Sequence, residues 1–440
     1  MAKSMADLAF AHLLLLSMAV NVGLLLKLKK ESGAGSLLNG LFMCGLRRAI
    51  DGSPISPQLE AAAHPELDDD YTKILKLSHG DPMLYEKFWK QAGENATIVI
   101  PGWQSISYFS DVGNVCWFLE PEFAREILRL HRVVGNAVTD DRYIVVGAGS
   151  SQLFHAVLYA LSPQDSEKPV DIVSASPFYS SYPAMTDCLK SGLYKWAGDA
   201  STYEKDGPFI ELVTYPNNPD GHIRLPAVNR SGGALVHDLA YYWPQYTPIT
   251  RPADHDIMLF SGSKCTGHAG TRIGWALVKS KEVAEKMVDF IVLDTIGVSK
   301  DSQLRSAKIL QVISDGCEAS SSYGKCLFRF GYHHLNERWL LLREASNQSG
   351  LFTLPIFTPN YCKFSNRTFE SQPAFAWLKC DTSVGDCEEF LKSFNVLSRG
   401  GKQFGASSYY TRVSLLDRDE VMRAFFRRLA MAKSPIQASR

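Results

Sequence analysis

Short apolar runs alternate with amphipathic, helix-length segments along most of this chain of 440 residues. Residues 121–134 repeat apolar side chains every three or four positions, and Gly135 follows them, a pattern that predicts a helix ending there. Apolar runs of strand length follow at 143–146, 170–173, 210–213, 234–236 and 257–260. Strands that alternate with helices in this way indicate a mostly parallel sheet covered by helices on both faces.

The N-terminus departs from this alternation. Residues 8–26 are 19 residues without a charge, enough for a helix of roughly 28 Å, close to the hydrocarbon thickness of a bilayer. We therefore expect residues 1–30 to form a transmembrane anchor. A cleaved signal peptide is the alternative, although no A-x-A site follows the run. Residues 31–70 contain several glycines and prolines and are expected to form a linker.

Composition and charge narrow the partners and the compartment. Lys and Arg together number 46, as do Asp and Glu, so no polyanion-binding surface is indicated and nucleic acid is not expected as a partner. The nine cysteines include no CxxC pair and show no even framework, which favours a reducing compartment. Lys27, Lys29 and Lys30 follow the apolar run directly and place the remainder of the chain in the cytosol by the positive-inside rule.

Four Asn-x-Ser/Thr triplets argue for the opposite side of the membrane. They begin at Asn95, Asn229, Asn347 and Asn366, and such glycosylation acceptors suit a lumenal domain. Because these triplets are common by chance, the cysteines and lysines carry more weight. The expectation is a catalytic region on the cytosolic face of the endoplasmic reticulum membrane.

Small and polar residues follow four of the predicted strands. They are GAGSSQ at 147–152, TYPNNPDG at 214–221, HDLAY at 237–241 and SGSKCTGHAGTRIGW at 261–275. Each segment alone is weak evidence for a site, since it also fits a plain turn, a helix cap or a solvated lysine. GAGSSQ in addition lacks the third glycine of the dinucleotide-binding motif GxGxxG. Because ligands bind at the carboxyl ends of parallel strands, the four together predict one site.

The last of these segments contains two cations, Lys264 and Arg272, between two apolar runs, and no acidic residue. A buried cation without a partner is costly. The two side chains therefore reach solvent or are completed by an anionic ligand.

NPDG, DLAY, and SGSK with an arginine eight residues later resemble the fold type I pyridoxal-phosphate aminotransferases in residue type and order. LSHGDP, SPFYSSY, ELVTYPNNPDG and YYTRVSLL are similar to the plant tryptophan aminotransferase-related family, which shares its catalytic module with alliin lyase. The resemblance runs from about Tyr71 to about Ala432. It implies an α/β fold with a mostly parallel sheet in a large domain, 116–320, and a smaller α+β domain made of 71–115 and 321–434.

The resemblance also implies pyridoxal 5′-phosphate as the cofactor. Lys264 is then the catalytic residue, which binds the cofactor through an imine and later moves the substrate Cα proton. Asp238 pairs with the pyridine nitrogen, while Tyr241 and Asn218 contact the 3′-oxygen. The phosphate is expected on Arg272 and on a helix start. The other expected phosphate-binding residues are Gly149, Ser150, Ser151 and Ser261.

Further residues match the family with alternatives left open. Tyr179 matches the aromatic that stacks on the cofactor ring, or is a core tyrosine. Arg412 matches the arginine that binds the substrate carboxylate, and Gly80 lies near that carboxylate, where a missing Cβ allows close approach. Tyr108 is expected at the phosphate of the neighbouring subunit in a homodimer. His268 is expected to have a structural or substrate-shaping role, and no metal site is expected.

The activity implied is conversion of L-tryptophan and a 2-oxo acid to indole-3-pyruvate and an amino acid, a step in auxin synthesis. The alternative enzyme is an alliinase-type C–S lyase that acts on S-alkyl-cysteine sulfoxides. From another class, a membrane-anchored, non-catalytic nucleotide-binding protein could use GAGSSQ. An intact set of Lys264, Asp238 and Asn218 argues against this third hypothesis.

Overall fold

The computed structural model describes residues 71–163, 165, 167–319 and 324–433, which belong to one compact unit. The expected anchor, 1–30, and linker, 31–70, lie outside the described residues. Among the residues that are described, no helix has both the length and the apolar character needed to cross a membrane.

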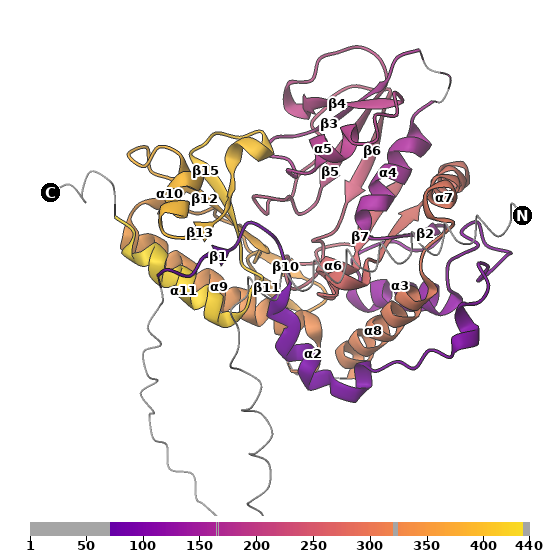
Figure 1. Ribbon diagram of the computed structural model, residues 1–440, viewed down its shortest axis with the longest axis horizontal. Helices are drawn as coiled ribbons and strands as arrows, with labels where there is room; N and C mark the ends of the chain where they lie inside the picture. The colour runs from indigo at the N-terminus through magenta and orange to yellow at the C-terminus, as the bar shows by residue number, and fades with distance from the viewer. Residues whose placement is uncertain (1–70, 164, 166, 320–323, 434–440) are drawn as a thin grey trace, which may run out of the picture. The chain divides into compact units, whose positions relative to one another are not determined.

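Among the described residues, a central sheet has seven strands in the order β2-β8-β7-β6-β5-β3-β4 (Figure 1). The strands are β2 (Tyr143–Gly147), β3 (Val170–Ser174), β4 (Tyr194–Asp199), β5 (Phe209–Thr214), β6 (Gly233–Asp238), β7 (Ile257–Ser261) and β8 (Gly274–Val278). Strands β4, β3, β5, β6 and β7 are parallel. Strand β8 is antiparallel to both of its neighbours. The predicted mostly parallel sheet is therefore confirmed, with one antiparallel strand inserted.

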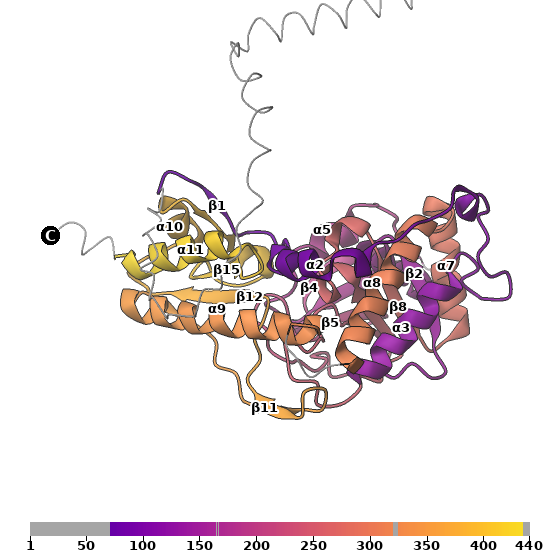
Figure 2. The same cartoon turned by 90° about the horizontal axis from the view of Figure 1, so that it is seen from below.

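Helices pack around this sheet. They are α3 (Pro121–Val134), α4 (Ser150–Leu161), α5 (Tyr182–Asp187), α7 (Lys281–Thr295) and α8 (Lys300–Ala319). Helix α3 has the predicted bounds, because its apolar side chains are buried at Phe123, Ile127 and Leu130 and because Gly135 ends it in the left-handed conformation. Helix α3 packs on α8 and helix α4 on α7, as Figures 1 and 2 show for the first pair.

A second, smaller sheet in the described chain has the order β14-β15-β12-β9. Its strands are β9 (Phe352–Thr353), β12 (Phe375–Cys380), β14 (Arg399–Gly400) and β15 (Tyr410–Ser414). Helices α9 (Leu327–Ser349) and α11 (Asp419–Met431) lie side by side next to it (Figures 1 and 2). A hairpin of β10 (Asn360–Cys362) and β11 (Arg367–Phe369) projects away from α9 in Figure 2.

The start of the described chain lies against its C-terminal part. Strand β1 (Leu75–Lys76) pairs in parallel with β13 (Val396–Leu397). The remaining elements are α2 (Glu86–Ala92), α6 (Gly262–Cys265), α10 (Cys387–Ser393) and the 3-10 helices η1 (Met83–Tyr85), η2 (Gly93–Ala96), η3 (Gly102–Ser105), η4 (Ala200–Thr202), η5 (Ala269–Thr271) and η6 (Gly401–Phe404). Because both sheets belong to one compact unit, the division into domains at 115/116 and 320/321 stays a prediction.

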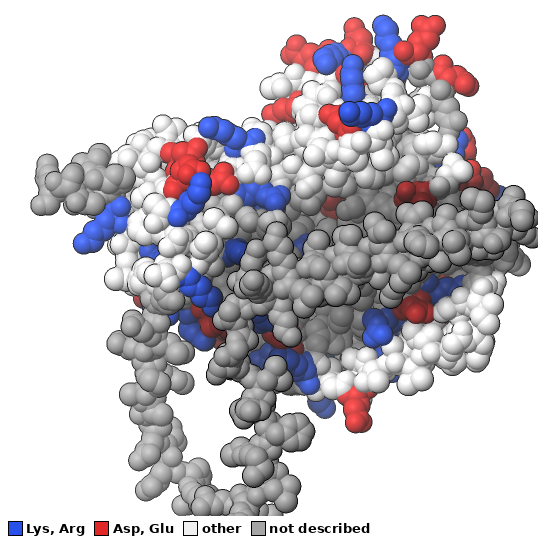
Figure 3. Space-filling model, viewed as in Figure 1, with Lys and Arg blue, Asp and Glu red and all other residues white. Residues whose placement is uncertain are grey.

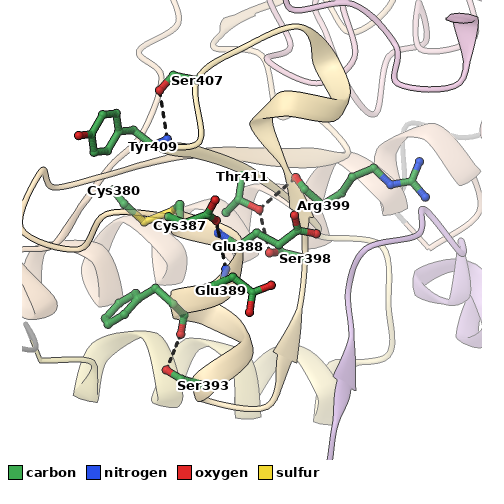
Figure 4. The surroundings of a disulfide bond; sticks show 12 residues. Cys380, Cys387, Glu388, Glu389, Ser393, Ser398, Arg399, Ser407, Tyr409 and Thr411 are labelled. Atoms are coloured by element: carbon green, nitrogen blue, oxygen red, sulfur yellow. Dashed lines mark hydrogen bonds between the residues drawn. A yellow bond between two sulfur atoms is a disulfide. The ribbon is translucent and has the colours of Figure 1, made fainter.

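Two disulfides in the described chain correct the interpretation of the cysteines. Cys317–Cys326 joins the end of α8 to the start of α9, and Cys380–Cys387 joins the end of β12 to the start of α10 (Figure 4). Unpaired cysteines in the described chain are Cys116, Cys188, Cys265 and Cys362. The expectation that the cysteines form no disulfide framework is therefore wrong for these four. It was one of the two reasons to favour a reducing compartment.

The surface agrees with the neutral composition. On the face that Figure 3 shows, Lys and Arg side chains lie interspersed with Asp and Glu side chains, without a broad area of one sign.

Substitution of Gly274 tests the close packing between β8 and the start of α4. A Cβ added there would lie 2.8 Å from the carbonyl oxygen of Phe260 and 2.8 Å from the backbone nitrogen of Ser150. Both neighbours are backbone atoms in regular structure, so they cannot turn aside. We expect Gly274→Ala to lower the free energy of unfolding by about 1–3 kcal/mol, measured by urea denaturation. The control Gly270→Ala, which meets nothing within 4 Å, should leave it unchanged; equal effects of the two would contradict the prediction.

Candidate active site

The polar segments that follow the strands meet in one row across the sheet. Asp238 at the end of β6 is opposite Thr214 at the end of β5. Gly274, which begins β8, is opposite both Ser261 at the end of β7 and Gly147 at the end of β2. The sheet therefore brings the predicted site segments to a common edge.

Lys264 lies just beyond this edge, in the one-turn helix α6. Its Nζ donates a hydrogen bond of 2.6 Å to the backbone carbonyl of Gly80. Burial lowers the pKa of the Lys264 amine to about 8, and the positive charge of Arg412 acts in the same direction. An amine with such a pKa carries a reactive neutral fraction near pH 7.

Two side chains fix the backbone of Lys264. Its carbonyl oxygen accepts hydrogen bonds from the Tyr246 hydroxyl at 3.0 Å and from Gln245 Nε2 at 3.3 Å. Tyr85 in turn donates to the Tyr246 hydroxyl at 3.0 Å. Sequence reasoning missed these residues, because a buried tyrosine with a backbone partner has the same sequence signature as any core tyrosine.

Arg412 on β15 is a buried cation with neutral partners. Its side chain is 3% exposed and donates from Nη1 to Asn218 Oδ1 at 2.9 Å and from Nη2 to the Ser78 carbonyl at 2.8 Å. The guanidinium lies over the Phe375 ring at 4.0 Å. Its Nε is buried without a hydrogen-bond partner in the described chain. Burial lowers the pKa of Arg412 to about 10, so the group is suited to an incoming anion.

Asp238 is held by two donors. One carboxylate oxygen accepts from the Ala240 backbone N–H at 3.1 Å, and the other accepts from the Tyr182 hydroxyl at 2.9 Å. Burial raises the pKa of Asp238. A cation beside this carboxylate would offset that burial. Tyr182 was missed by the sequence analysis, although it stands in the SPFYSSY motif that pointed to Tyr179.

The two aromatic candidates lie near Arg412 and Asp238. Tyr241 is buried, and burial raises its pKa, while Arg412 and a hydrogen bond with Asn218 act to lower it. Asn218 thus contacts both Tyr241 and Arg412. The ring of Tyr179 packs edge-on against Tyr182, with centroids 5.3 Å apart. The structure therefore brings these predicted residues together.

The start of α4 and Arg272 form an anion cradle. Gly149 precedes the helix with φ 78° and no side-chain cap, so the first N–H groups of α4, at Ser150 and Ser151, lack intrahelical partners. A Cβ on Gly149 would lie 2.5 Å from Arg272 Nη2, which places the guanidinium directly beside the helix start. Helix N–H groups and a guanidinium are together suited to a phosphate.

Two candidates lie apart from this set. Tyr108 is 66% exposed, and its expected contact is with a second copy of the chain. His268 contacts Thr266, with Nδ1 3.1 Å from Oγ1, and its ring packs edge-on against Trp89. Burial lowers the pKa of His268 to about 4. A neutral imidazole with these contacts fits the structural or substrate-shaping role better than that of an acid.

Comparison with solved structures defines the class of fold. Aspartate aminotransferase from Thermus thermophilus with maleate matches with a TM-score of 0.57, covering 81% of this chain and 91% of that one at 17% identity. A methionine aminotransferase from Escherichia coli matches with a TM-score of 0.56. The fold is that of the fold type I aminotransferases.

Sequence comparison is more specific. The family described as "Allinase" matches residues 75–433. Tryptophan aminotransferase-related protein 2 of Arabidopsis thaliana is 52% identical over 429 residues, 96% of this chain and 97% of that protein. Alliin lyase of Allium cepa is 35% identical over 79% of this chain and 74% of its own. The chain belongs to the alliinase family and, within it, to the tryptophan aminotransferase-related proteins, as the motifs predicted.

The proximity of Lys264 and Arg412 gives a test by chemical modification. Amines react in the neutral form, so the reaction of Lys264 in cofactor-free protein should be half-maximal near pH 8, the pKa of about 8 set by burial and Arg412. Arg412→Gln removes one of the causes that lower the pKa of Lys264 and should move the midpoint to higher pH. Peptide mass spectrometry after an amine-specific reagent measures both. The exposed Lys281, whose pKa is raised by Glu285, is the internal control; identical midpoints for the two lysines would refute the prediction.

Proposed function

We propose that this protein is a pyridoxal-phosphate-dependent aminotransferase that converts L-tryptophan and a 2-oxo acid to indole-3-pyruvate and an amino acid, a reaction that feeds auxin synthesis. One observation carries the proposal. Lys264 and Arg412 are two cations in one site, and both are bonded to neutral groups. An amino acid substrate supplies the carboxylate that Arg412 lacks.

The residues present fit the proposed cofactor. Its phosphate matches Arg272 and the start of α4, and its pyridine nitrogen matches the buried carboxylate of Asp238, whose pKa is raised. Its phenolic oxygen matches Tyr241 and Asn218. Its aldehyde carbon requires an amine with a neutral fraction, which Lys264 provides.

When bound, the cofactor supplies an electron sink for the bonds at the substrate Cα. A pKa of about 8 leaves roughly one Lys264 amine in ten neutral at pH 7, and this Nζ can accept the Cα proton and return it. Arg412 binds the carboxylate and fixes the orientation of Cα. Gly80 leaves the space between them open, because a Cβ there would lie 3.0 Å from Lys264 Nζ.

Tryptophan as the amino donor is supported by the relatives. Proteins named tryptophan aminotransferase-related are 52% identical to this chain in Arabidopsis thaliana and 56% identical in rice. No contact in the described site selects an indole ring by itself. The substrate therefore belongs to the proposal, together with the 2-oxo acid acceptor.

A homodimer is the proposed assembly. Between η2 and α3, side chains such as Trp103, Ile106 and Val112 are 72%, 79% and 79% exposed. Large apolar side chains exposed along one segment mark a contact surface. A second copy of the chain would cover them and bring Tyr108 to its neighbour's phosphate site. Attachment to the endoplasmic reticulum membrane is proposed from the apolar run at 8–26 alone.

The alternative activity is the alliinase-type C–S lyase. The observation that favours it is the 35% identity with alliin lyase, since elimination and transamination begin with the same proton transfer. The nucleotide-binding alternative lacks support of this kind, because Lys264 and Arg412 have no role in it.

Lys264→Ala tests the catalytic amine. We expect kcat to fall by at least about 10²- to 10⁴-fold, the usual contribution of a general acid–base group, because the variant lacks Nζ. The variant should still fold and bind the cofactor without a covalent bond, as the phosphate cradle is intact. Absorbance of the bound cofactor and its release on denaturation measure this. Lys279→Ala, at a side chain that is 61% exposed, is the control, and near-normal turnover of Lys264→Ala would exclude the assigned role.

Acceptor dependence separates the two activities. With tryptophan and a 2-oxo acid, we expect indole-3-pyruvate and a new amino acid in equal amounts. Without the acceptor, product should stop at about one equivalent per site, because the amino group stays on the enzyme. Chromatography of the keto acid measures both. Steady release of pyruvate and ammonia from an S-alkyl-cysteine sulfoxide without acceptor would establish the lyase instead.

A further inference from the structure

Four cysteines form two disulfides, which a protein in the reducing cytosol does not normally contain. Their Cα atoms are 4.5 Å apart in Cys317–Cys326 and 5.7 Å apart in Cys380–Cys387, within the range of natural disulfides. Three of these side chains are at most 2% exposed, and Cys317 is 9% exposed. Buried disulfides of this kind persist in oxidising compartments and are rare in the cytosol.

The Cys380–Cys387 bridge supports the sheet that carries Arg412. It links the end of β12 to α10 (Figure 4). The first N–H groups of α10 are capped by Asp386. Strand β12 pairs along its length with β15, where Trp377 is opposite Arg412. The disulfide therefore stabilises the sheet that positions Arg412.

The glycosylation triplets give a second, independent observation. The asparagines at 95, 229, 347 and 366 are all exposed. Two triplets have both the asparagine and the hydroxyl residue exposed and the asparagine on a loop. They are Asn229 with Ser231, between β5 and β6, and Asn366, in the turn of the projecting β10–β11 hairpin (Figure 2), with Thr368 on β11. Asn366 has φ 54°, a turn conformation that asparagine tolerates.

The other two triplets are less suited to a glycan in the folded protein. Asn347 lies in the last turn of α9, and the hydroxyl of Ser349 is bonded to the Ala432 carbonyl at 3.0 Å. Asn95 lies in η2, next to the exposed apolar segment proposed as the dimer contact. The loop sites are therefore the ones expected to be occupied.

We propose that the catalytic unit matures in the lumen of the secretory pathway, with both disulfides formed and with N-linked glycans at Asn229 and Asn366. This replaces the cytosolic expectation, which depended on unpaired cysteines and on three lysines after the apolar run. Long domains translocate largely regardless of such flanking charge. The proposal is independent of the reaction, so its failure leaves the aminotransferase assignment untouched.

Expression of the full chain in plant cells tests this proposal. Endoglycosidase treatment should increase the electrophoretic mobility, and Asn229→Gln and Asn366→Gln should each remove one step of the shift. Ser231→Ala and Thr368→Ala are matched variants that keep each asparagine and should remove the same steps. All four variants should retain aminotransferase activity, since these positions lie outside the site.

Two further measurements use the same material. Alkylation before and after reduction, followed by mass spectrometry, should show Cys317, Cys326, Cys380 and Cys387 protected until reduction. Protease added to intact microsomes should leave the catalytic unit undigested. Absence of the endoglycosidase shift overturns the proposal whatever the thiols show, and so does digestion of the unit in intact microsomes.

Discussion

The site depends on how two cations are accommodated when none of the described carboxylates forms an ion pair with either of them. The amine of Lys264 and the guanidinium of Arg412 are both bonded to backbone carbonyls of one short segment, at Gly80 and Ser78. Carbonyl dipoles stabilise a cation less than a carboxylate does, and burial keeps the pKa of both groups below their usual values. A site of this kind gains stability when anionic ligands bind, and this bias toward anions underlies the proposed chemistry.

The architecture follows from the need to hold that segment in place. The Leu77 N–H donates to the Leu397 carbonyl at 2.9 Å, and the Leu77 carbonyl accepts from the Ser414 N–H at 2.8 Å. Residues 78–80 are thus held beside β13 and beside β15, which carries Arg412, while Lys264 lies in α6, directly after β7 of the central sheet. The geometry of the site therefore depends on the N-terminal strand β1 as much as on β15 and the central sheet.

Local pattern was sufficient for much of the fold and for the residue types of the site. Helix α3 and the parallel strands follow the apolar periodicity, and the motifs indicated the family. Local pattern could not predict the contacts of the site, because Asn218 and Arg412 are 194 residues apart and Ser78 and Arg412 are 334 residues apart in the sequence. The disulfides could not be predicted from the sequence for a related reason. Separations of 9 and 7 residues do not fix a Cα distance until the fold places α8 beside α9 and β12 beside α10.

The protonation state of groups near Lys264 also affects which reaction can follow the first proton transfer. Elimination of indole from tryptophan requires an acid to protonate the ring, because carbon is a poor leaving group. His268 is near Lys264 in the chain, but its pKa of about 4 keeps it neutral at physiological pH, and its Nδ1 is engaged by Thr266. It is therefore poorly suited to be that acid. A sulfoxide substrate carries its own leaving group and makes no such demand, so the lyase alternative depends on the substrate offered, whereas the proposed substrate, tryptophan, would favour transfer of its amino group.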